Sequence, residues 1–138
     1  MIKRIYSDEV NKEFEFDSEN GIYVFCGYNS DKCLDEIVNA YKNDYFCLSS
    51  SSIKNKSSLL SEGDLMIKNL EEFILRVEKS DIDAPVFIFG VFDRIDLGVD
   101  IAPYLERLVK IKNQVFISVC KNYPLDKFEK FTKSIFRV

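Results

Sequence analysis

Hydrophobic and polar residues alternate in the first part of this chain. Ile2 and Ile5 are followed, after a polar stretch, by Phe14 and Phe16 with a charged residue between them. Short alternations of this kind are typical of strands that bury one face. The pattern predicts an N-terminal antiparallel ribbon, followed by a turn at Asn20-Gly21.

Uninterrupted apolar runs replace the alternation after residue 21. Such runs are typical of strands that are buried on both faces, as in parallel sheets. The most hydrophobic of them is the segment Val86–Phe89. Together the runs predict strands at 22–26, 45–48, 86–89, 114–119 and 135–138.

Amphipathic segments lie between these runs. Their apolar residues recur every three or four positions, which predicts helices with one buried face. The first helix starts at Asp31 and the second runs from about Gly63 to Val77. The expected buried faces consist of Cys33, Leu34, Ile37, Val38 and Tyr41 in the first helix, and of Met66, Leu70, Phe73 and Val77 in the second.

Two further helices are predicted in the second half of the chain. Asp100 is placed to cap a helix that has Pro103 in its first turn. We expect this helix to direct Leu105, Leu108 and Val109 toward the core. A shorter helix at 125–131 follows Pro124.

The order of these elements indicates the fold class. Strand and helix alternate from residue 22 onward, which predicts an α/β fold with a mainly parallel sheet flanked by helices and an N-terminal antiparallel ribbon. A length of 138 residues without repeats or long linkers indicates a single domain, 1–138. The Ser- and Lys-rich stretch 49–58 is predicted to be a loop and is the best candidate for disorder.

Composition indicates the cellular environment of the protein but says little about its function. The net charge is −4 and the pI is about 5.0, which argues against a globally basic nucleic-acid surface but not against a local patch. No apolar run is long enough to span a membrane, and no secretory signal is recognisable, so we expect a cytoplasmic protein without membrane association. No C-x-x-C pair is present, so we expect reduced, buried thiols and no metal site at Cys26, Cys33, Cys47 and Cys120.

Several segments, taken in order, resemble the head domain of ABC-type ATPases of the RecF and SMC branch. The opening strands are similar to the first strands of that branch, and Leu60-Ser61-Glu62-Gly63-Asp64 resembles its signature motif, Leu-Ser-x-Gly-Glu. Residues 85–96 resemble the Walker B strand and the following D-loop, and residues 114–118 resemble the next strand. The resemblance implies a minimal P-loop NTPase-like core.

The segment that corresponds to the phosphate loop is degenerate. A working loop has the pattern G-x-x-x-x-G-K-[ST], in which backbone N–H groups and Lys hold phosphates and Ser or Thr holds Mg²⁺. Gly27 and Asn29 remain and Lys32 can stand in for the Lys, but the loop is one residue short. Asp31 replaces a Gly and opposes phosphate, and Cys33 offers sulfur where Mg²⁺ prefers oxygen. We therefore predict a plain strand–turn–helix that binds no nucleotide.

Two further catalytic features of the family are missing. Its metal-binding and water-activating carboxylates would fall at Phe89 and Gly90 or at Gly90 and Val91, depending on the register. The chain contains no His, so the family's histidine near Cys120 is absent as well. These losses predict that the chain is not an enzyme. Two nearby carboxylates are interpreted as capping or solvent-exposed groups: Asp93 and Asp96.

The signature-like segment has two interpretations. In an ABC dimer the signature motif presents a Ser hydroxyl, a Gly backbone and a helix start to the ATP of the opposite subunit. Ser61, Glu62, Gly63 and Asp64 would do so here. Ser61 and Asp64 also fit a Ser-x-x-Asp capping box, which would need no ligand. Both interpretations remain open from the sequence.

The function implied by the resemblance is that of an inactive ABC-like pseudo-ATPase. It would act as an interaction or regulatory subunit, by partnering an active ABC-type ATPase or by self-association, with ATP reached only through the partner. Such a subunit would suit a bacterial or phage defence system. The alternatives are a residual ATP-binding protein and a DNA-binding adaptor on the same core. The second alternative is supported only by five lysines: Lys54, Lys56, Lys127, Lys130 and Lys133.

Overall fold

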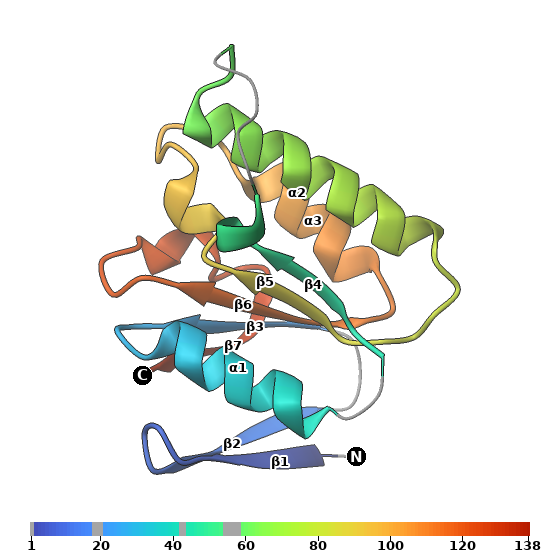
Figure 1. Ribbon diagram of the computed structural model, residues 1–138. Coiled ribbons are helices and arrows are strands. Elements are labelled where there is room, and N and C mark those ends of the chain that lie inside the picture. Colours follow the sequence, from blue (N-terminus) through green and yellow to red (C-terminus); the bar gives the residue numbers. More distant parts are fainter. Residues whose placement is uncertain (1, 18–20, 42–43, 54–58) are drawn as a thin grey trace.

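A computed structural model describes residues 2–17, 21–41, 44–53 and 59–138 of the chain (Figure 1). It contains two sheets and three α-helices within these ranges. The strands are β1 (Ile2–Ser7), β2 (Lys12–Asp17), β3 (Gly21–Cys26), β4 (Phe46–Ser49), β5 (Val86–Phe89), β6 (Gln114–Val119) and β7 (Thr132–Arg137). The helices are α1 (Ser30–Ala40), α2 (Glu62–Lys79) and α3 (Ala102–Lys110), with short 3-10 turns η1 (Ser50–Ser52), η2 (Phe92–Arg94) and η3 (Leu125–Lys127).

The main sheet is entirely parallel. Its five strands have the order β4-β5-β6-β3-β7. β1 and β2 pair antiparallel in a separate two-stranded sheet, with Ile5 opposite Phe14. The expected α/β fold with a parallel sheet and an N-terminal antiparallel ribbon is therefore confirmed.

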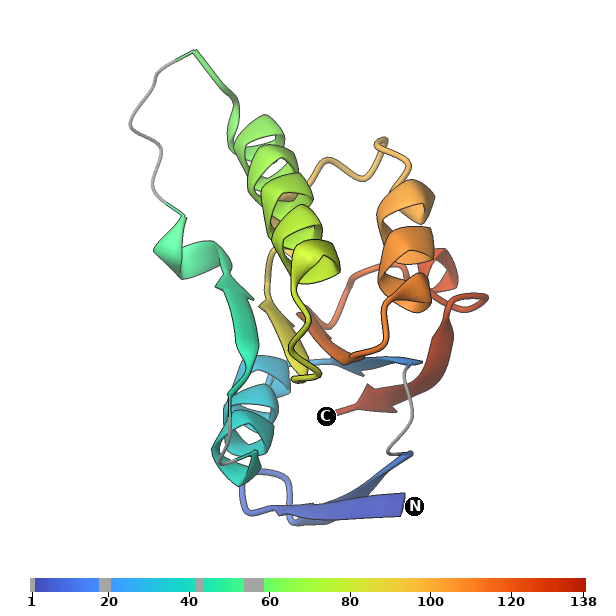
Figure 2. The ribbon, with the colours of Figure 1, turned by 90° about the vertical axis from the view of Figure 1, so that its right-hand side faces the viewer.

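Helices cover both faces of the main sheet (Figures 1 and 2). α2, α3 and the segment around Phe128 pack on one face, against residues such as Val24 and Ile117. α1 and the ribbon of β1 and β2 pack on the other face, against Phe25 and Phe116. The alternation of side chains along each buried strand thus supplies two separate cores.

Aromatic side chains attach the ribbon to the sheet. The rings of Phe16 and Phe116 meet edge to face at a centroid distance of 5.1 Å, and those of Phe14 and Phe25 also at 5.1 Å. Phe14 makes a further edge-to-face contact with Phe136 of β7. Each such pair adds about 0.5–1.5 kcal/mol beyond its buried area, so the ribbon is a firm part of the core.

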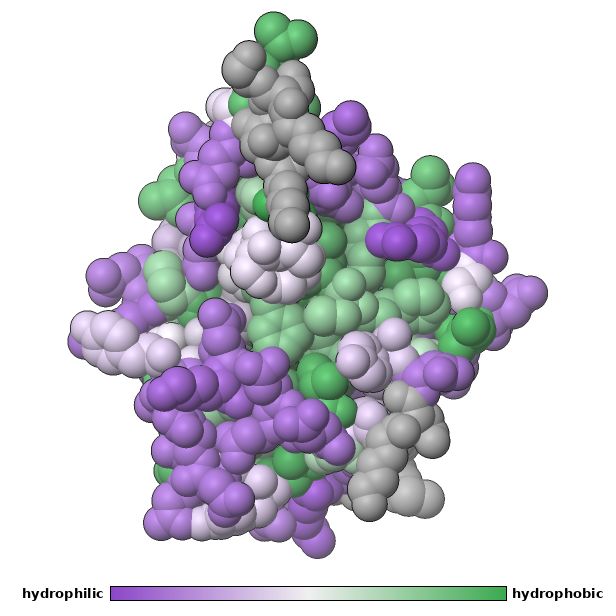
Figure 3. Space-filling view, in the orientation of Figure 1, coloured by the Kyte–Doolittle hydropathy of each residue, from purple (hydrophilic) through white to green (hydrophobic). Residues whose placement is uncertain are grey.

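A strand is present near 45–48 as expected, but the prediction that it is buried is wrong. β4 spans Phe46–Ser49 at the edge of the sheet, only Leu48 is buried, and Tyr45 precedes the strand with 48% of its surface exposed. Figure 3 shows hydrophobic surface in the middle of this face, between α1 and α2. The apolar run in the sequence reflects contact with one neighbouring strand and one helix, rather than burial on both sides.

Three other local expectations are corrected. The helix at 125–131 is reduced to η3, because the chain turns at Phe128 and enters β7 at Thr132. Val109 is 38% exposed, since Leu105 and Leu108 already occupy the inward side of α3 and the next residue lies about 100° further round. Two of the four thiols expected to be buried are exposed: Cys47 and Cys120.

The remaining local expectations concern the start of α3, the loop 49–58, the turn at Asn20-Gly21 and membrane-spanning helices. The expected cap of α3 is shifted by one residue: Ile101 is the N-cap, and the carboxylate of Asp100, just before it, accepts a hydrogen bond from the Ala102 N–H over 3.0 Å. In the predicted loop 49–58, residues 50–52 form η1, and residues 54–58, with Lys54 and Lys56, lie outside the described ranges. Asn20 of the predicted turn also lies outside them. In the described part of the chain, no helix has the length and apolar character needed to cross a bilayer.

Candidate functional site

The carboxyl ends of β3 and β6 form the candidate site. These strands are neighbours in the sheet, but the segments that follow them diverge. After β3 the chain forms α1 on one face, and after β6 it continues to Phe128 on the opposite face. Open parallel sheets bind their ligands at such points of divergence.

The turn after β3 is tightly enclosed. Gly27 has φ +141°, and a Cβ at this position would lie 1.8 Å from the carbonyl oxygen of Val138. The Gly27 N–H donates to the Val119 carbonyl over 3.2 Å, and the Gly27 carbonyl accepts from the Ser30 N–H over 3.3 Å. Glycine is required here because the chain around Val138 passes directly beside it.

Asp31 is fixed at the edge of the sheet. Its Oδ1 accepts a hydrogen bond from the Ser118 hydroxyl over 2.5 Å, and that hydroxyl accepts one from the Gly90 N–H over 3.1 Å. Ser118 is completely buried. The contact therefore ties together the start of α1 and the ends of β5 and β6, and it places a carboxylate where a phosphate loop would need positive charge.

Other carboxylates lie close to Asp31. Burial, reinforced by the charge of Asp31, raises the pKa of Asp35. Burial also raises the pKa of Asp93, although a hydrogen bond of 2.9 Å from the Cys120 N–H opposes the rise. Asp93 is thus a link between η2 and the end of β6, rather than the helix cap expected from the sequence. Asp96 accepts from the Gly98 N–H over 2.7 Å, within its own turn.

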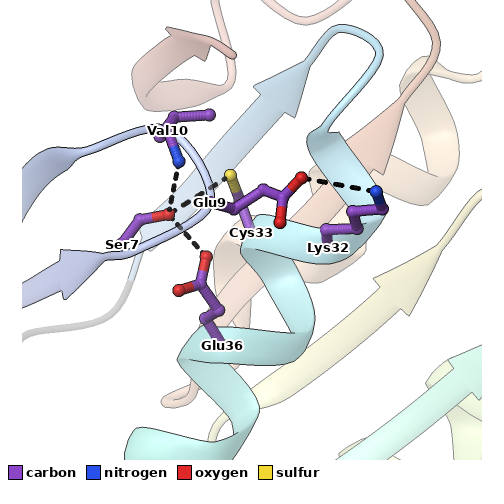
Figure 4. Close-up of polar contacts among 6 residues, drawn as sticks. All are labelled: Ser7, Glu9, Val10, Lys32, Cys33 and Glu36. Carbon is purple, nitrogen blue, oxygen red and sulfur yellow. Dashed lines mark hydrogen bonds and ion pairs between the residues drawn. The ribbon is translucent and has the colours of Figure 1, made fainter.

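Lys32 and Cys33 face the ribbon rather than the turn (Figure 4). The Lys32 Nζ lies 3.3 Å from Glu9 Oε1, and the Cys33 Sγ lies 3.7 Å from the Ser7 hydroxyl, which is 2.5 Å from Glu36 Oε1. Burial raises the pKa of the Cys33 thiol, which favours the protonated form. Of the predicted loop residues, only Gly27 and Asn29 therefore belong to the turn itself.

The signature-like segment begins α2. Ser61 is the N-cap, and its hydroxyl accepts a hydrogen bond from the Asp64 N–H over 3.1 Å. Glu62 forms an exposed ion pair of 3.1 Å with Arg94, and Gly63 lies beside the backbone of residues 94–96. The Ser61 part of the capping box is present, and all four residues of the motif lie together at the helix start.

A hollow lies beside the same turn, and it was not predicted from the sequence. Its volume is about 330 Å³, and its lining consists of Cys26, Gly27, Tyr28, Lys121, Arg137 and Val138. Cys26 is opposite both Val119 and Arg137 in the parallel register, so Arg137 lies on the face of α2 and α3, away from Asp31. Tyr28, Lys121 and Arg137 come from three separate segments of the chain, and the order of the strands brings them together.

Within residues 2–17, 21–41, 44–53 and 59–138, no three His, Cys, Asp or Glu side chains are arranged to hold a metal ion. β5 ends at Phe89 and is followed by Gly90 and Val91, and none of these three residues carries a carboxylate. No protein-family model matches the chain, and no curated protein matches it.

Proposed function

We propose that this chain is a catalytically inactive, ABC-like domain that acts by binding another protein, the ATP-bearing subunit of an ABC-type ATPase. The observation that carries the proposal is the contact of Asp31 with Ser118 and, through it, with Gly90. It holds a carboxylate at the place where a nucleotide-binding domain of this kind would receive phosphates. The chain's own site is therefore unsuited to ATP.

The arrangement of strands supports a minimal P-loop NTPase-like core. The turn at Gly27 follows a central parallel strand and leads directly into α1. β5, which resembles a Walker B strand, is separated from β3 only by β6. This strand order is compatible with such a core, while Lys32 and Cys33 contact the ribbon.

The start of α2 supplies the means of interaction. A helix N-terminus carries free N–H groups and a partial positive charge, which suit an anion presented from outside. Ser61 and Glu62 are exposed, and Gly63 leaves the backbone unobstructed by a side chain. In an ABC-type dimer this segment would contact the γ-phosphate of ATP held by the partner subunit.

The first experiment examines the chain's own site. Calorimetric titration with MgATP is expected to show no binding to the wild type. Asp31→Gly removes the opposing carboxylate, and Cys33→Ser supplies a hydroxyl, but neither is expected to create binding because Lys32 and residue 33 face the ribbon. Magnesium-dependent binding of ATP to the wild type would refute the loss of the site.

The second experiment examines the interaction. Association with a RecF- or SMC-type ATPase head is measured in the presence of a non-hydrolysable ATP analogue, and turnover is measured with ATP. Ser61→Asp keeps a good N-cap but opposes phosphate. Gly63→Ala fits the fold and directs its methyl group toward the backbone of residues 94–96, 3.5 Å from the nearest atom, so it leaves the outer surface of the helix start unchanged.

Ser61→Asp is expected to weaken ATP-dependent association about tenfold or more, whereas Gly63→Ala and the matched control Asn39→Asp, which adds a charge at an exposed position of α1, are not. Association that survives Ser61→Asp would exclude the signature-like contact. If no ATPase head associates with the wild type or changes its turnover, the interaction itself is refuted.

A further inference from the structure

The hollow beside Tyr28 combines two cations with an exposed aromatic ring. The Lys121 Nζ lies 4.8 Å from the centre of the Tyr28 ring, and Tyr28 is 82% exposed. Arg137 lines the same hollow. These three groups lie at the carboxyl edge of the sheet, and the strand register places Arg137 on the opposite face from Asp31 and α1.

Among the described residues, these two cations differ from several other basic groups in having no ion pair with a carboxylate. Lys32, Arg94, Arg107 and Lys133 each form an ion pair with a carboxylate. Over the described ranges, neither Lys121 nor Arg137 forms one. Their charge is therefore available to an anion from solution, although the protein as a whole carries a net charge of −4.

The charge of Arg137 also acts on a buried thiol in the lining of the hollow. Burial raises the pKa of the Cys26 thiol, and the charge of Arg137 opposes that rise, while Cys120 and Asp93 add to it. The Cys26 Sγ donates to the Cys120 carbonyl over 3.2 Å. The Asp93 carboxylate accepts from the Cys120 N–H, so one of its oxygens is already engaged with the backbone.

Size and shape limit the ligand. A volume of about 330 Å³ is at the lower end of the range for small-molecule sites, which is about 300–1,000 Å³. An exposed ring can stack only on a base that is not paired, and stacking of this kind does not depend on sequence. A duplex would present its phosphates but not the face of a base.

We propose that this hollow binds single-stranded nucleic acid, with an unpaired base stacked on Tyr28 and the adjoining phosphate between Lys121 and Arg137. Of the lysines that the sequence suggested for such a role, Lys54 and Lys56 lie outside the described ranges, and Lys130 lies over the Phe131 ring. Lys127 donates to the Leu97 carbonyl, and Lys133 lies 3.9 Å from Asp17. Binding would be independent of the contact between α2 and a partner ATPase.

Fluorescence anisotropy with a labelled oligothymidylate at low salt tests the site. Wild-type protein is expected to bind saturably, with an affinity that falls as salt rises because the phosphate contact releases counterions. Tyr28→Ala is expected to weaken binding about tenfold, and Tyr28→Phe is expected to retain it, since only the ring is needed. Because Tyr28 is exposed, both variants are expected to be as stable as the wild type, and thermal melts check this.

Lys121→Gln and Arg137→Gln are expected to weaken binding and to lower the salt slope by about 0.7 for each phosphate that the protein no longer neutralises. Lys79→Gln, an exposed lysine at the end of α2, is the matched control and is expected to change neither quantity. An equal weakening in the control would show diffuse electrostatic attraction and overturn the site. Absence of binding at low salt, equal affinity for a duplex, or equal competition by polyglutamate would also overturn it.

Discussion

The Ser118 hydroxyl donates to Asp31 Oδ1 over 2.5 Å, and it thereby joins β6 to the first turn of α1. The same hydroxyl accepts from the Gly90 N–H, which also lies 3.3 Å from the Ser118 carbonyl. The connection is buried at Ser118 and reaches the surface at Asp31. A carboxylate that would repel a ligand phosphate here serves as an internal hydrogen-bond acceptor.

Ser118→Ala is expected to lower the free energy of unfolding by about 1–3 kcal/mol, because it removes a hydrogen bond to a charged group from a buried position. The Gly90 N–H would keep the Ser118 carbonyl as a partner, which limits the destabilisation. Urea denaturation measures the change, with Ser134→Ala in the partly exposed β7 as the control. A change no larger than in that control would show that the hydrogen bond to Asp31 contributes little.

Gly27 and Gly63 form a matched pair for the effect of an added methyl group. Gly27→Ala is expected to destabilise the fold by at least about 2 kcal/mol, because φ +141° suits only glycine and the Cβ would meet the Val138 carbonyl. Gly63→Ala is expected to be neutral or stabilising by up to about 1 kcal/mol, since the position is helical and the added Cβ would lie at an ordinary contact distance, 3.5 Å, from the nearest atom. Equal denaturation midpoints for the two variants would contradict the tight approach at Gly27.

Stability is expected to fall at alkaline pH. Burial raises the pKa of Tyr41 and that of Tyr123 to about 12, from an ordinary value of 10.0. Between these values the unfolded chain releases protons that the folded chain keeps, so the free energy of unfolding decreases as pH rises through this window. Tyr41→Phe should make the decrease shallower, although it also removes the hydrogen bond from Tyr41 to Gln114 Oε1.

Unfolding is measured with urea between pH 9 and pH 12, a range that covers the window between the ordinary tyrosine pKa of 10.0 and the raised value of about 12. Tyr6→Phe, at an exposed position, serves as the control for the replacement of a tyrosine. An unchanged slope in Tyr41→Phe would show that Tyr41 titrates alike in the folded and unfolded chains.

The thiols are expected to react in two classes. Cys47 and Cys120 are exposed and should react with a thiol reagent in the folded protein, whereas Cys26 and Cys33 should react only after denaturation. Mass spectrometry after timed labelling assigns each site. Labelling of Cys33 at the rate of Cys47 would show that the ribbon does not stay on α1, because Ser7 covers that thiol.

Much of the fold could be predicted because each buried element carries its own pattern. The apolar runs located β3, β5 and β6, and the spacing in α2 located its buried residues. The position of a strand within the sheet has no such local pattern, so the exposed edge of β4 could not be predicted. Residues 125–131 do not form the expected helix because Thr132 must pair beside Ile22, a constraint set by a distant strand.

The candidate site was less predictable. The turn at Gly27 follows from the sequence, but the orientation of Lys32 and Cys33 depends on the ribbon, which the chain folds back over α1. Tyr28, Lys121 and Arg137 come from different strand ends and match no motif. A site formed by residues from different strand ends cannot be predicted until the order of the strands is known.

The contact between Phe14 and Phe136 has a consequence for how the molecule forms. These rings come from opposite ends of the sequence, so the core beneath the ribbon closes only after nearly every strand is in place. Topologies dominated by distant contacts fold slowly, because long stretches of chain must be ordered first. Until β7 arrives, the aromatic face of β3 stays uncovered along one side, and self-association competes with folding at that stage.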